Sequence, residues 1–421
     1  GSSGGSSGPT LPSQVTSPNP PNSAIDIIDV ISFTGLSWAP ATGATSYDVY
    51  FGSTNPPPYV VTTINTSYNP GTLSFSTTYF WRIDAKNSVG ISVGNLWRFN
   101  IDGTRPWVQT SNPSLTSDIA KCIVADTYSL YIAGYDSSPG NEQWRIEKRD
   151  KITGVLVTAF GINGVVVSNP SVASDEICSV TADDYYLYIA GYDESPGNWQ
   201  WRIEKRDKTT GALITAFGTN GVVVSNPSAL YEQPYSITDD TDYLYIAGSD
   251  VSPGNEQWRI EKRDKITGAL VTTFGTNGVV VFNPSSASDV PYSITDDTYY
   301  LYIAGSDSTP TLAQWRIEKR YKTTGALVTT FGTNGVVVSE PTAASDIPYS
   351  IVAPDALFIA GVAGGGGGEW YIESRGNYLG GFQAFGTGGW VESNPSAGLD
   401  EPYSITTDTD YLYIVGYDYS S

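Results

Sequence analysis

The chain has 421 residues, of which 40% are hydrophobic and 15% charged, and it carries a formal net charge of −21 with no histidine. The negative charge opposes binding to nucleic acid or insertion at an anionic membrane surface, and no apolar run reaches the roughly 18–20 residues of a membrane-spanning helix. Without histidine, Ser-His-Asp and Cys-His catalysis and most zinc and haem sites are excluded.

The composition favours an all-β fold. Charged residues are scarce while Ser, Thr, Gly and Tyr are abundant, which is typical of many short strands and turns. The length allows several domains, and aromatic residues, 13% of the chain, are numerous enough to fill their cores.

Residues 1–23 form a Gly/Ser-rich and then Pro-rich segment, which predicts a flexible tail that cannot fold alone. The chain contains no methionine, so Gly1 is not a translation start. Either a leader has been removed or the first residues were added. We favour export followed by cleavage, and we therefore expect an extracellular or cell-surface location.

Residues 24–103 alternate strand-like and turn-like segments, including "ISFTGLSWAP" and "TTYFWRIDAKN". This pattern resembles a fibronectin type III module of secreted microbial proteins, with Trp38 in an early core strand and Leu73 and Tyr79 placed like a tyrosine corner. The resemblance implies a two-sheet sandwich with Trp38 and Trp81 in its core. Such modules are spacers or adhesive units.

A period of 57 residues governs the chain from Asp118 onward. Each unit offers four strand-like segments, "PYSIT", "YLYIAG", "QWRIEKRD" and "GVVV", which is typical of a propeller blade. The segments "TTFGTNGVVV" and "LYIAG" resemble the delta-sixty repeat of secreted microbial proteins, and the resemblance implies a β-propeller while leaving the function open. The period is carried by Trp144, Trp201, Trp258 and Trp315, with Trp370 following after 55 residues.

The last unit is incomplete. Five units are complete, but the sixth, residues 401–421, ends after its second strand. The segment Trp107–Asp118 matches the fourth strand and the following loop of the other units, since Asn112 lies 57 residues before Asn169. Because a propeller closes on itself, we expect six blades over residues 104–421, with the closing blade a composite of both ends.

No segment of the sequence matches the third strand of this composite blade, and three explanations remain open. The blade has three strands, the chain is cut short, or another molecule supplies the strand. The last explanation would let an extended peptide complete a free sheet edge and join copies of the chain head to tail. The candidate residues for this joint are Ser13, Gln14, Val15 and Thr16 in the tail and Tyr411, Tyr413 and Tyr417 in the last strand.

Two covalent modifications are expected. Cys122 and Cys178 are the only cysteines, and they fall at neighbouring positions of the first strand in adjacent units. Since successive strand residues face opposite sides, we predict that they meet in a disulfide, with two free buried thiols as the alternative. The sequon Asn65-Thr66-Ser67 in the first module makes Asn65 a candidate glycosylation site.

Charged residues recur in register, which favours structural roles. Four copies of "RIEKRDK" or its variant hold 16 of the 22 basic residues, and their interspersed acids predict ion pairs rather than a polyanion-binding stripe. Aspartate pairs such as Asp183-Asp184 and Asp239-Asp240 predict tight turns, with calcium binding as the alternative. An active site needs unlike groups that converge at one point, so we predict no enzyme, no metal and no cofactor.

The sequence therefore predicts an all-β protein with a fibronectin type III-like sandwich, a six-bladed β-propeller and a composite closing blade. Its expected role is that of an extracellular structural protein, a subunit of a surface filament or surface layer that binds copies of itself head to tail. The alternative is a cell-surface adhesin or a propeller that binds surface glycans through tyrosine-rich loops.

Overall fold

The computed structural model describes residues 9–27, 35–71, 73–74, 77–101, 108–308, 312–364, 368–393, 400–408 and 411–418, with residues 25–27 and 417–418 described for their backbone only. Every regular element in these ranges is a β-strand, which confirms the all-β prediction. The same ranges contain no helix with the length and apolarity that crossing a bilayer requires. The chain divides into two compact units, residues 1–109 with 152–154 and residues 110–151 with 155–421.

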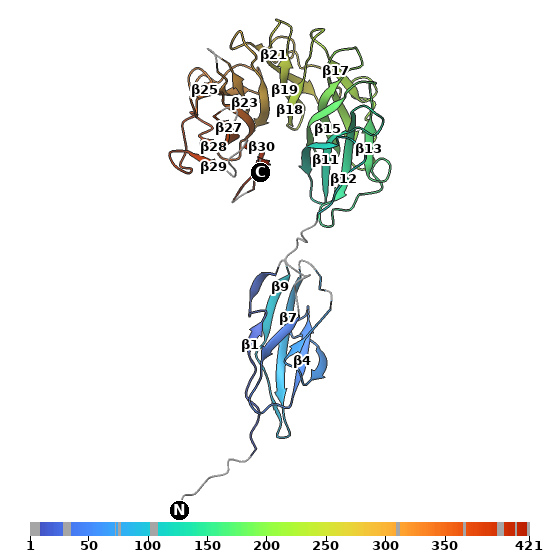
Figure 1. The fold of residues 1–421 in the computed structure, drawn as a ribbon, viewed down its shortest axis with the longest axis vertical. Coiled ribbons are helices and arrows are strands. Elements are labelled where there is room, and N and C mark those ends of the chain that lie inside the picture. The colour runs from blue at the N-terminus through green and yellow to red at the C-terminus, as the bar shows by residue number, and fades with distance from the viewer. Residues whose placement is uncertain are drawn as a thin grey trace, which may run out of the picture. The chain divides into compact units, whose positions relative to one another are not determined.

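Within its described residues the first unit holds two sheets (Figure 1). The smaller sheet has the strand order β1-β3-β6, and the larger has the order β2-β9-β7-β4-β5 with β8 paired to β7. All pairs are antiparallel except β2 with β9. The bounds are β1 Thr16–Asn19, β2 Ala24–Ile27, β3 Leu36–Ala39, β4 Ser46–Gly52, β5 Tyr59–Thr63, β6 Ser67–Tyr68, β7 Thr77–Lys86, β8 Ile91–Ser92 and β9 Trp97–Ile101.

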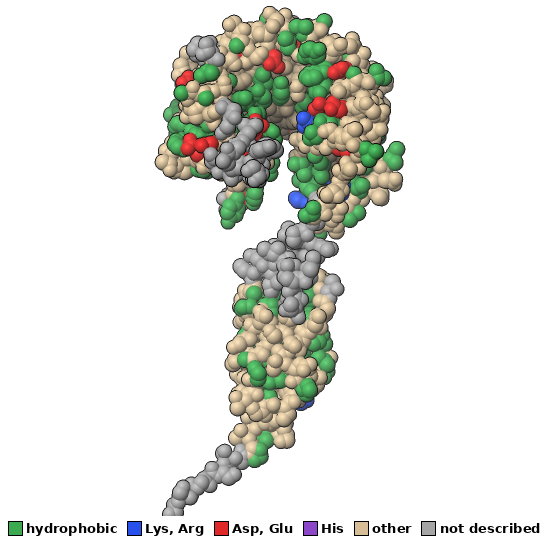
Figure 2. All heavy atoms as spheres, in the orientation of Figure 1, with side chains coloured by type: hydrophobic (Ala, Val, Ile, Leu, Met, Phe, Trp, Pro, Cys, Tyr) green, Lys and Arg blue, Asp and Glu red, His purple; other side chains and the backbone are tan. Residues whose placement is uncertain are grey.

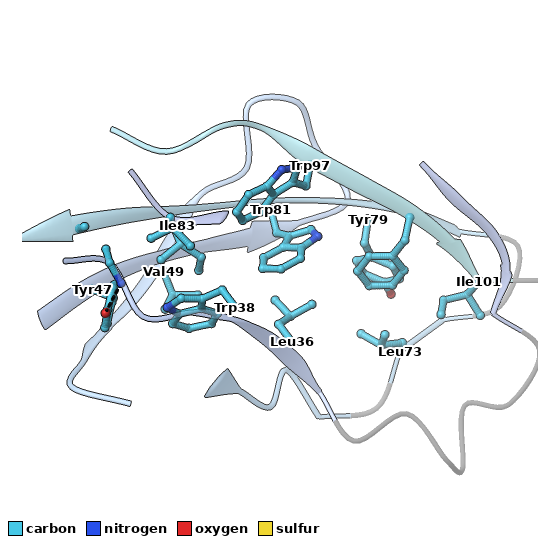
Figure 3. Packing of buried hydrophobic residues seen from close by; sticks show 14 residues of the cluster. Leu36, Trp38, Tyr47, Val49, Leu73, Tyr79, Trp81, Ile83, Trp97 and Ile101 are labelled. Carbon is cyan, nitrogen blue, oxygen red and sulfur yellow. Dashed lines mark hydrogen bonds between the residues drawn. The ribbon is translucent and has the colours of Figure 1, made fainter. Parts of the chain in front are cut away.

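Alternating apolar residues build the core of the first unit (Figure 3). Trp38 and Trp81 are 4% and 0% exposed, as predicted for core residues. The hydroxyl of Tyr79 accepts a hydrogen bond from the Ser74 amide at 2.8 Å, and Leu73 is buried in the same core. This is the corner that the sequence pattern placed at Leu73 and Tyr79.

The first unit begins earlier than the predicted boundary at residue 24. Val15 is a buried member of its core, and Thr16 pairs with Ala39 in the smaller sheet. The Ser13 amide donates a hydrogen bond to Thr42 O at 2.9 Å. One buried apolar side chain and strand pairing therefore outweigh the Pro-rich composition that predicted a free tail here.

The second unit is a series of antiparallel sheets that follow one another around an arc (Figure 1). Among the described residues, the first five sheets have four strands in chain order and the sixth has two. The bounds are β10 Ile119–Ala125, β11 Ser129–Asp136, β12 Gln143–Asp150 and β13 Val165–Ser168 in the first sheet; β14 Glu176–Ala182, β15 Tyr186–Asp193, β16 Gln200–Asp207 and β17 Val222–Ser225 in the second; β18 Pro234–Asp239, β19 Tyr243–Asp250, β20 Gln257–Asp264 and β21 Val279–Phe282 in the third; β22 Pro291–Asp296, β23 Tyr300–Asp307, β24 Gln314–Tyr321 and β25 Val336–Ser339 in the fourth; β26 Ile347–Val352, β27 Leu357–Ala363, β28 Glu369–Arg375 and β29 Trp390–Ser393 in the fifth; and β30 Asp400–Thr407 and β31 Leu412–Asp418 in the sixth.

Neighbouring sheets pack through both faces of their second strands, which explains why "YLYIAG" reads as an apolar run rather than an alternating one. Tyr188 and Trp201 of the second sheet pack toward the third sheet against Ile237, Leu244 and Ile246. The same set of positions forms the core at the other interfaces between complete sheets.

Candidate functional site

A serine of the first strand links the second, third, fourth and fifth sheets each to the next one, whereas the first sheet has Cys122 at this position. The hydroxyl oxygen of Ser236 accepts the main-chain N–H of Ile294 at 3.2 Å. The same contact recurs at Ser179, Ser293 and Ser350. The matching residue of the sixth sheet is Ser404, which is exposed.

Buried ion clusters form the second repeated link. Glu204 binds Arg202 and Arg206 at 2.8 and 2.7 Å, and Ser168 of the preceding sheet donates a hydrogen bond to it at 3.0 Å. Although burial alone would raise the pKa of the equivalent Glu261, its two arginine neighbours lower it below the usual range. These clusters confirm the predicted ion pairs.

The aspartate pairs serve turns and inter-sheet ion pairs. Asp183 Oδ1 accepts the N–H groups of Tyr185 and Tyr186, and Lys265 of the third sheet binds Asp183 and its own Asp239 at 3.0 and 2.7 Å. This is the turn chemistry that the sequence predicted. Within the described part of the chain, acidic and Cys residues form no group of three or more that could hold a metal ion.

A glycine turn completes each of the four interfaces between complete sheets. Gly211, in the turn after the third strand of the second sheet, has a φ of +75°. A Cβ atom at Gly211 would lie 2.5 Å from Val166 Cγ2 and 3.2 Å from Phe160 Cε2, so only glycine fits. The neighbouring Thr210 O accepts the Gly161 N–H at 2.8 Å. Equivalent turns place Gly268, Gly325 and Gly380 on the preceding sheets.

The interface between the fifth and sixth sheets has a groove of about 910 Å³ at the position of this turn. Phe385 is half-buried there, whereas its counterparts Phe160, Phe217, Phe274 and Phe331 are fully buried. The apolar lining consists of Phe358, Ile372, Phe385, Val391, Leu412 and Ile414. The groove thus exposes surface that the other interfaces cover.

Both ends of the sheet series expose residues whose counterparts are buried. Tyr413 and Val415 of β31 are 49% and 64% exposed, whereas their counterparts Tyr245 and Ala247 are fully buried. At the other end Ile123 of the first sheet is 59% exposed. Hydrophobic side chains are visible on the surface near both ends of the arc (Figure 2). The two ends therefore present the two halves of one repeated interface.

The segment before the first sheet packs like the fourth strand and loop of a preceding sheet. Ser111 Oγ donates to Glu147 Oε1 at 2.6 Å, as Ser168 does to Glu204. Asp118 accepts the Ser114 amide at 3.0 Å, like the equivalent aspartates of later loops. Trp107, which begins the predicted match, lies outside the described residues.

The predicted joint residues belong to different units. Ser13, Val15 and Thr16 are engaged in the first unit, where Gln14 Nε2 also donates to Val93 O at 2.7 Å. In the second unit, Tyr411 is 68% exposed. The Tyr413 hydroxyl donates to Asp408 at 2.6 Å. Tyr417 lies in β31, and its side chain is outside the described residues.

The predicted disulfide is absent, since Cys122 and Cys178 are free thiols. Cys178 is the extra residue of a β-bulge between Ile177 and Ser179, and a bulge breaks the strict alternation on which the prediction depended. Its sulfur accepts a hydrogen bond from Gln233 at 3.4 Å, so it faces the following sheet.

Asn65, the predicted glycosylation site, is exposed in a bend between β5 and β6, and its modification stays a prediction.

Two features were missed in the sequence. The bulge residues Tyr235, Tyr292, Tyr349 and Tyr403 form a ladder of edge-to-face contacts with centroid distances of 5.5, 5.6 and 5.8 Å. The repeated "PYS" was the available signal. The second feature is Glu232, which stands where the other loops carry aspartate and whose carboxylate is buried without a hydrogen-bond partner among the described residues.

No family model, no curated protein and no solved structure matches the chain. The fold itself defines the class, an all-β protein of repeated antiparallel sheets. This architecture is consistent with a β-propeller-like repeat protein.

Proposed function

We propose that the chain is an extracellular structural protein, a subunit of a surface filament or surface layer that is joined to its neighbour through the sixth sheet. In this proposal the first unit is a fibronectin type III-like module. The second unit is a six-bladed β-propeller whose closing blade combines β30 and β31 with residues 108–118. The observation that carries the proposal is the two-stranded sixth sheet beside an open apolar groove.

The repeated contacts support closure of the ring. Lys208, Lys265 and Lys322 each bind an aspartate of the preceding sheet at 2.9–3.0 Å. By the same register Lys151 of the first sheet is matched to Asp408 of the sixth. Closure would also cover the apolar residues at both ends, and burying such surface contributes about 25 cal/mol per Å².

In the closed ring, no described residue fills the third-strand position of the sixth sheet. Along its outer side β31 has no strand partner in the described residues, and unpaired strand edges recruit other chains. Contacts that join unlike surfaces of successive molecules grow filaments. Because residues 13–16 are already held in the first unit, the proposal places the joint at the sixth sheet rather than in the tail.

Electron microscopy and sedimentation of the full chain test the proposal. We expect filaments or particles far larger than the 45.1 kDa monomer. Val391→Glu adds a charge to the groove lining and should abolish assembly. Val338→Glu is the matched control, since Val338 is an exposed residue of the fourth strand in the fourth sheet and its counterpart in the fifth sheet is already Glu392.

A wild-type chain that sediments as a monomer at every concentration and forms no filaments would contradict the proposal. If that monomer binds a glycan on an array, the alternative role as an adhesin is favoured instead. Circular dichroism and thermal unfolding of both variants should match the wild type, which separates a lost joint from a lost fold.

A further inference from the structure

We infer that the groove between the fifth and sixth sheets binds an extended segment of a partner polypeptide with the chemistry of the repeat's own third strand and glycine turn. The inference rests on the proposed role of the sixth sheet as a joint and names what that joint accepts.

Four equivalent positions show what fills such a groove. At each of them the turn after the third strand of the next sheet covers the Phe-Gly corner of the preceding one. Between the second and third sheets, Thr267 O accepts the Gly218 N–H at 2.8 Å. Gly268 lies against Phe217 and Val223 so closely that a Cβ atom would come within 2.5 Å of Val223 Cγ2.

The fifth sheet retains the groups that receive this segment. Phe385 and Val391, the counterparts of Phe217 and Val223, line the groove. The Gly386 N–H, the counterpart of Gly218, has no acceptor among the described residues. Ser393 is exposed, whereas its counterpart Ser225 donates to Glu261 of the next third strand at 2.7 Å.

The free edge of β31 favours a polypeptide over a lipid or a glycan. Its counterpart β19 pairs with β18 on one side and with β20 on the other, whereas β31 pairs with β30 alone in the described ranges. The outer edge therefore offers main-chain donors and acceptors in the spacing that an antiparallel strand satisfies.

Charge selects among peptides. Asp355 and Asp408 line the groove, and the whole chain carries a net charge of −21. The third strand and turn of the third sheet, residues 257–269 (QWRIEKRDKITGA), hold four basic and two acidic residues. A segment of this type is complementary to the groove, and an acidic segment is not.

Two substitutions distinguish this groove from the permanent interfaces. Lys262 Nζ donates to Lys322 O in the next turn at 2.8 Å, and Ser374 stands at the lysine position of the fifth sheet. Phe358 replaces the tyrosine whose hydroxyl in the fourth sheet donates to Asn377 O at 3.5 Å. Without the lysine ammonium and the tyrosine hydroxyl, the segment is held less firmly than within the chain, as expected for a partner that binds from outside.

Fluorescence anisotropy with a labelled peptide of residues 257–269 and the full chain tests the inference. We expect saturable binding. The Gly268→Val peptide should bind about tenfold more weakly or worse, because its side chain would overlap the lining. The Ile266→Ser peptide is the matched control and should bind unchanged, since Ile266 is 70% exposed in its own turn.

Variants of the protein give the reverse test. Ser374→Lys restores a lost donor and should tighten binding of the peptide by about tenfold, whereas Val391→Glu should abolish it. The inference is overturned if the peptide does not bind or if the Gly268→Val peptide binds equally well. It is also overturned if a peptide of residues 9–19 competes with the labelled peptide for the groove. Filaments without peptide binding would refute this inference alone, whereas peptide binding without filaments would refute the proposed function alone.

Discussion

Replacing Glu232 by aspartate should stabilise the second unit. The aspartates at this loop position are well bound. Asp289 accepts the Ser285 amide at 2.9 Å and the Ser308 amide at 2.8 Å, and it also accepts the Ser285 hydroxyl. Glu232 has one more methylene group, and both of its carboxylate oxygens are buried without a partner among the described residues. In the Glu232 loop, Ser228 and Val251 stand at the positions of Ser285 and Ser308.

The magnitude follows from the pKa of Glu232. Burial raises this pKa to about 7 from an ordinary value of 4.5, although the nearby Ser228 lowers it in part. Because the folded chain binds the proton more tightly than the unfolded chain, the carboxylate lowers stability progressively as pH rises from about 4.5 to about 7. Above that window the loss is roughly 3 kcal/mol. Burial also raises the pKa of the equivalent Asp175 in spite of its hydrogen bonds, so an aspartate recovers only part of this loss. Removing one methylene costs about 1 kcal/mol, so Glu232→Asp should raise the free energy of unfolding by up to about 2 kcal/mol at pH 7.5.

Thermal and urea unfolding of the full chain between pH 4.5 and 7.5 measure this effect. At pH 7.5 the midpoint of the second unit should rise by up to roughly 6 °C, and the gain should shrink as the pH falls toward 4.5. Glu232→Gln keeps the shape and removes the charge, so it should equal the wild type at pH 4.5 and exceed it at pH 7.5. A gain that is absent, or that stays constant across this pH range, would refute the reasoning.

Two further outcomes concern the ring and the thiols. If the ring is closed, a carbodiimide should form an amide between Lys151 and Asp408 within the monomer, in addition to the amide between Lys265 and Asp183. Lys151→Arg should remove only the Lys151–Asp408 amide. If the ring is open, only the Lys265–Asp183 amide should form. Burial raises the pKa of Cys178 to about 12 and raises that of Cys122 as well, so at pH 8 both thiols should react with a disulfide reagent roughly 1,000-fold more slowly than a free thiol. Unfolding without a reductant should release two reactive thiols per chain, and none would be released if the disulfide predicted from the sequence were present.

The repeat made most of the second unit predictable. A 57-residue period fixes four strands in each unit, and the burial of Trp201 and its counterparts follows from that period alone. The ion pairs of the Arg–Glu–Arg strand were predicted correctly. Arginines in register would repel each other unless acidic residues lay between them. In the first unit Trp38, Leu73 and Tyr79 are buried in the core, as the resemblance to a fibronectin type III module implied.

Side-chain direction at irregular backbone could not be predicted. The bulge at Cys178 turns its thiol toward the third sheet, and no feature of the two-residue period marks a bulge. Val15 was missed because a single apolar residue among prolines has no period at all. The groove at Phe385 was predicted only in part. The sequence shows two strand-like segments in the sixth unit, but only the structure shows that the lysine replaced by Ser374 binds the turn of the next sheet.

The fifth sheet retains the groups with which the other sheets receive a glycine turn. Phe385, Val391 and Gly386 keep the identities that receive a glycine turn, although no described residue of this chain supplies one. An apolar surface of this kind is costly to expose, since each Å² left in water forgoes about 25 cal/mol. At the same interface, Phe358 and Ser374 replace the tyrosine hydroxyl and the lysine ammonium that bind the turn at the other interfaces. A surface that keeps its shape but lacks these two donors suits an occupant from another molecule, and for this reason we propose the sixth sheet as the joint.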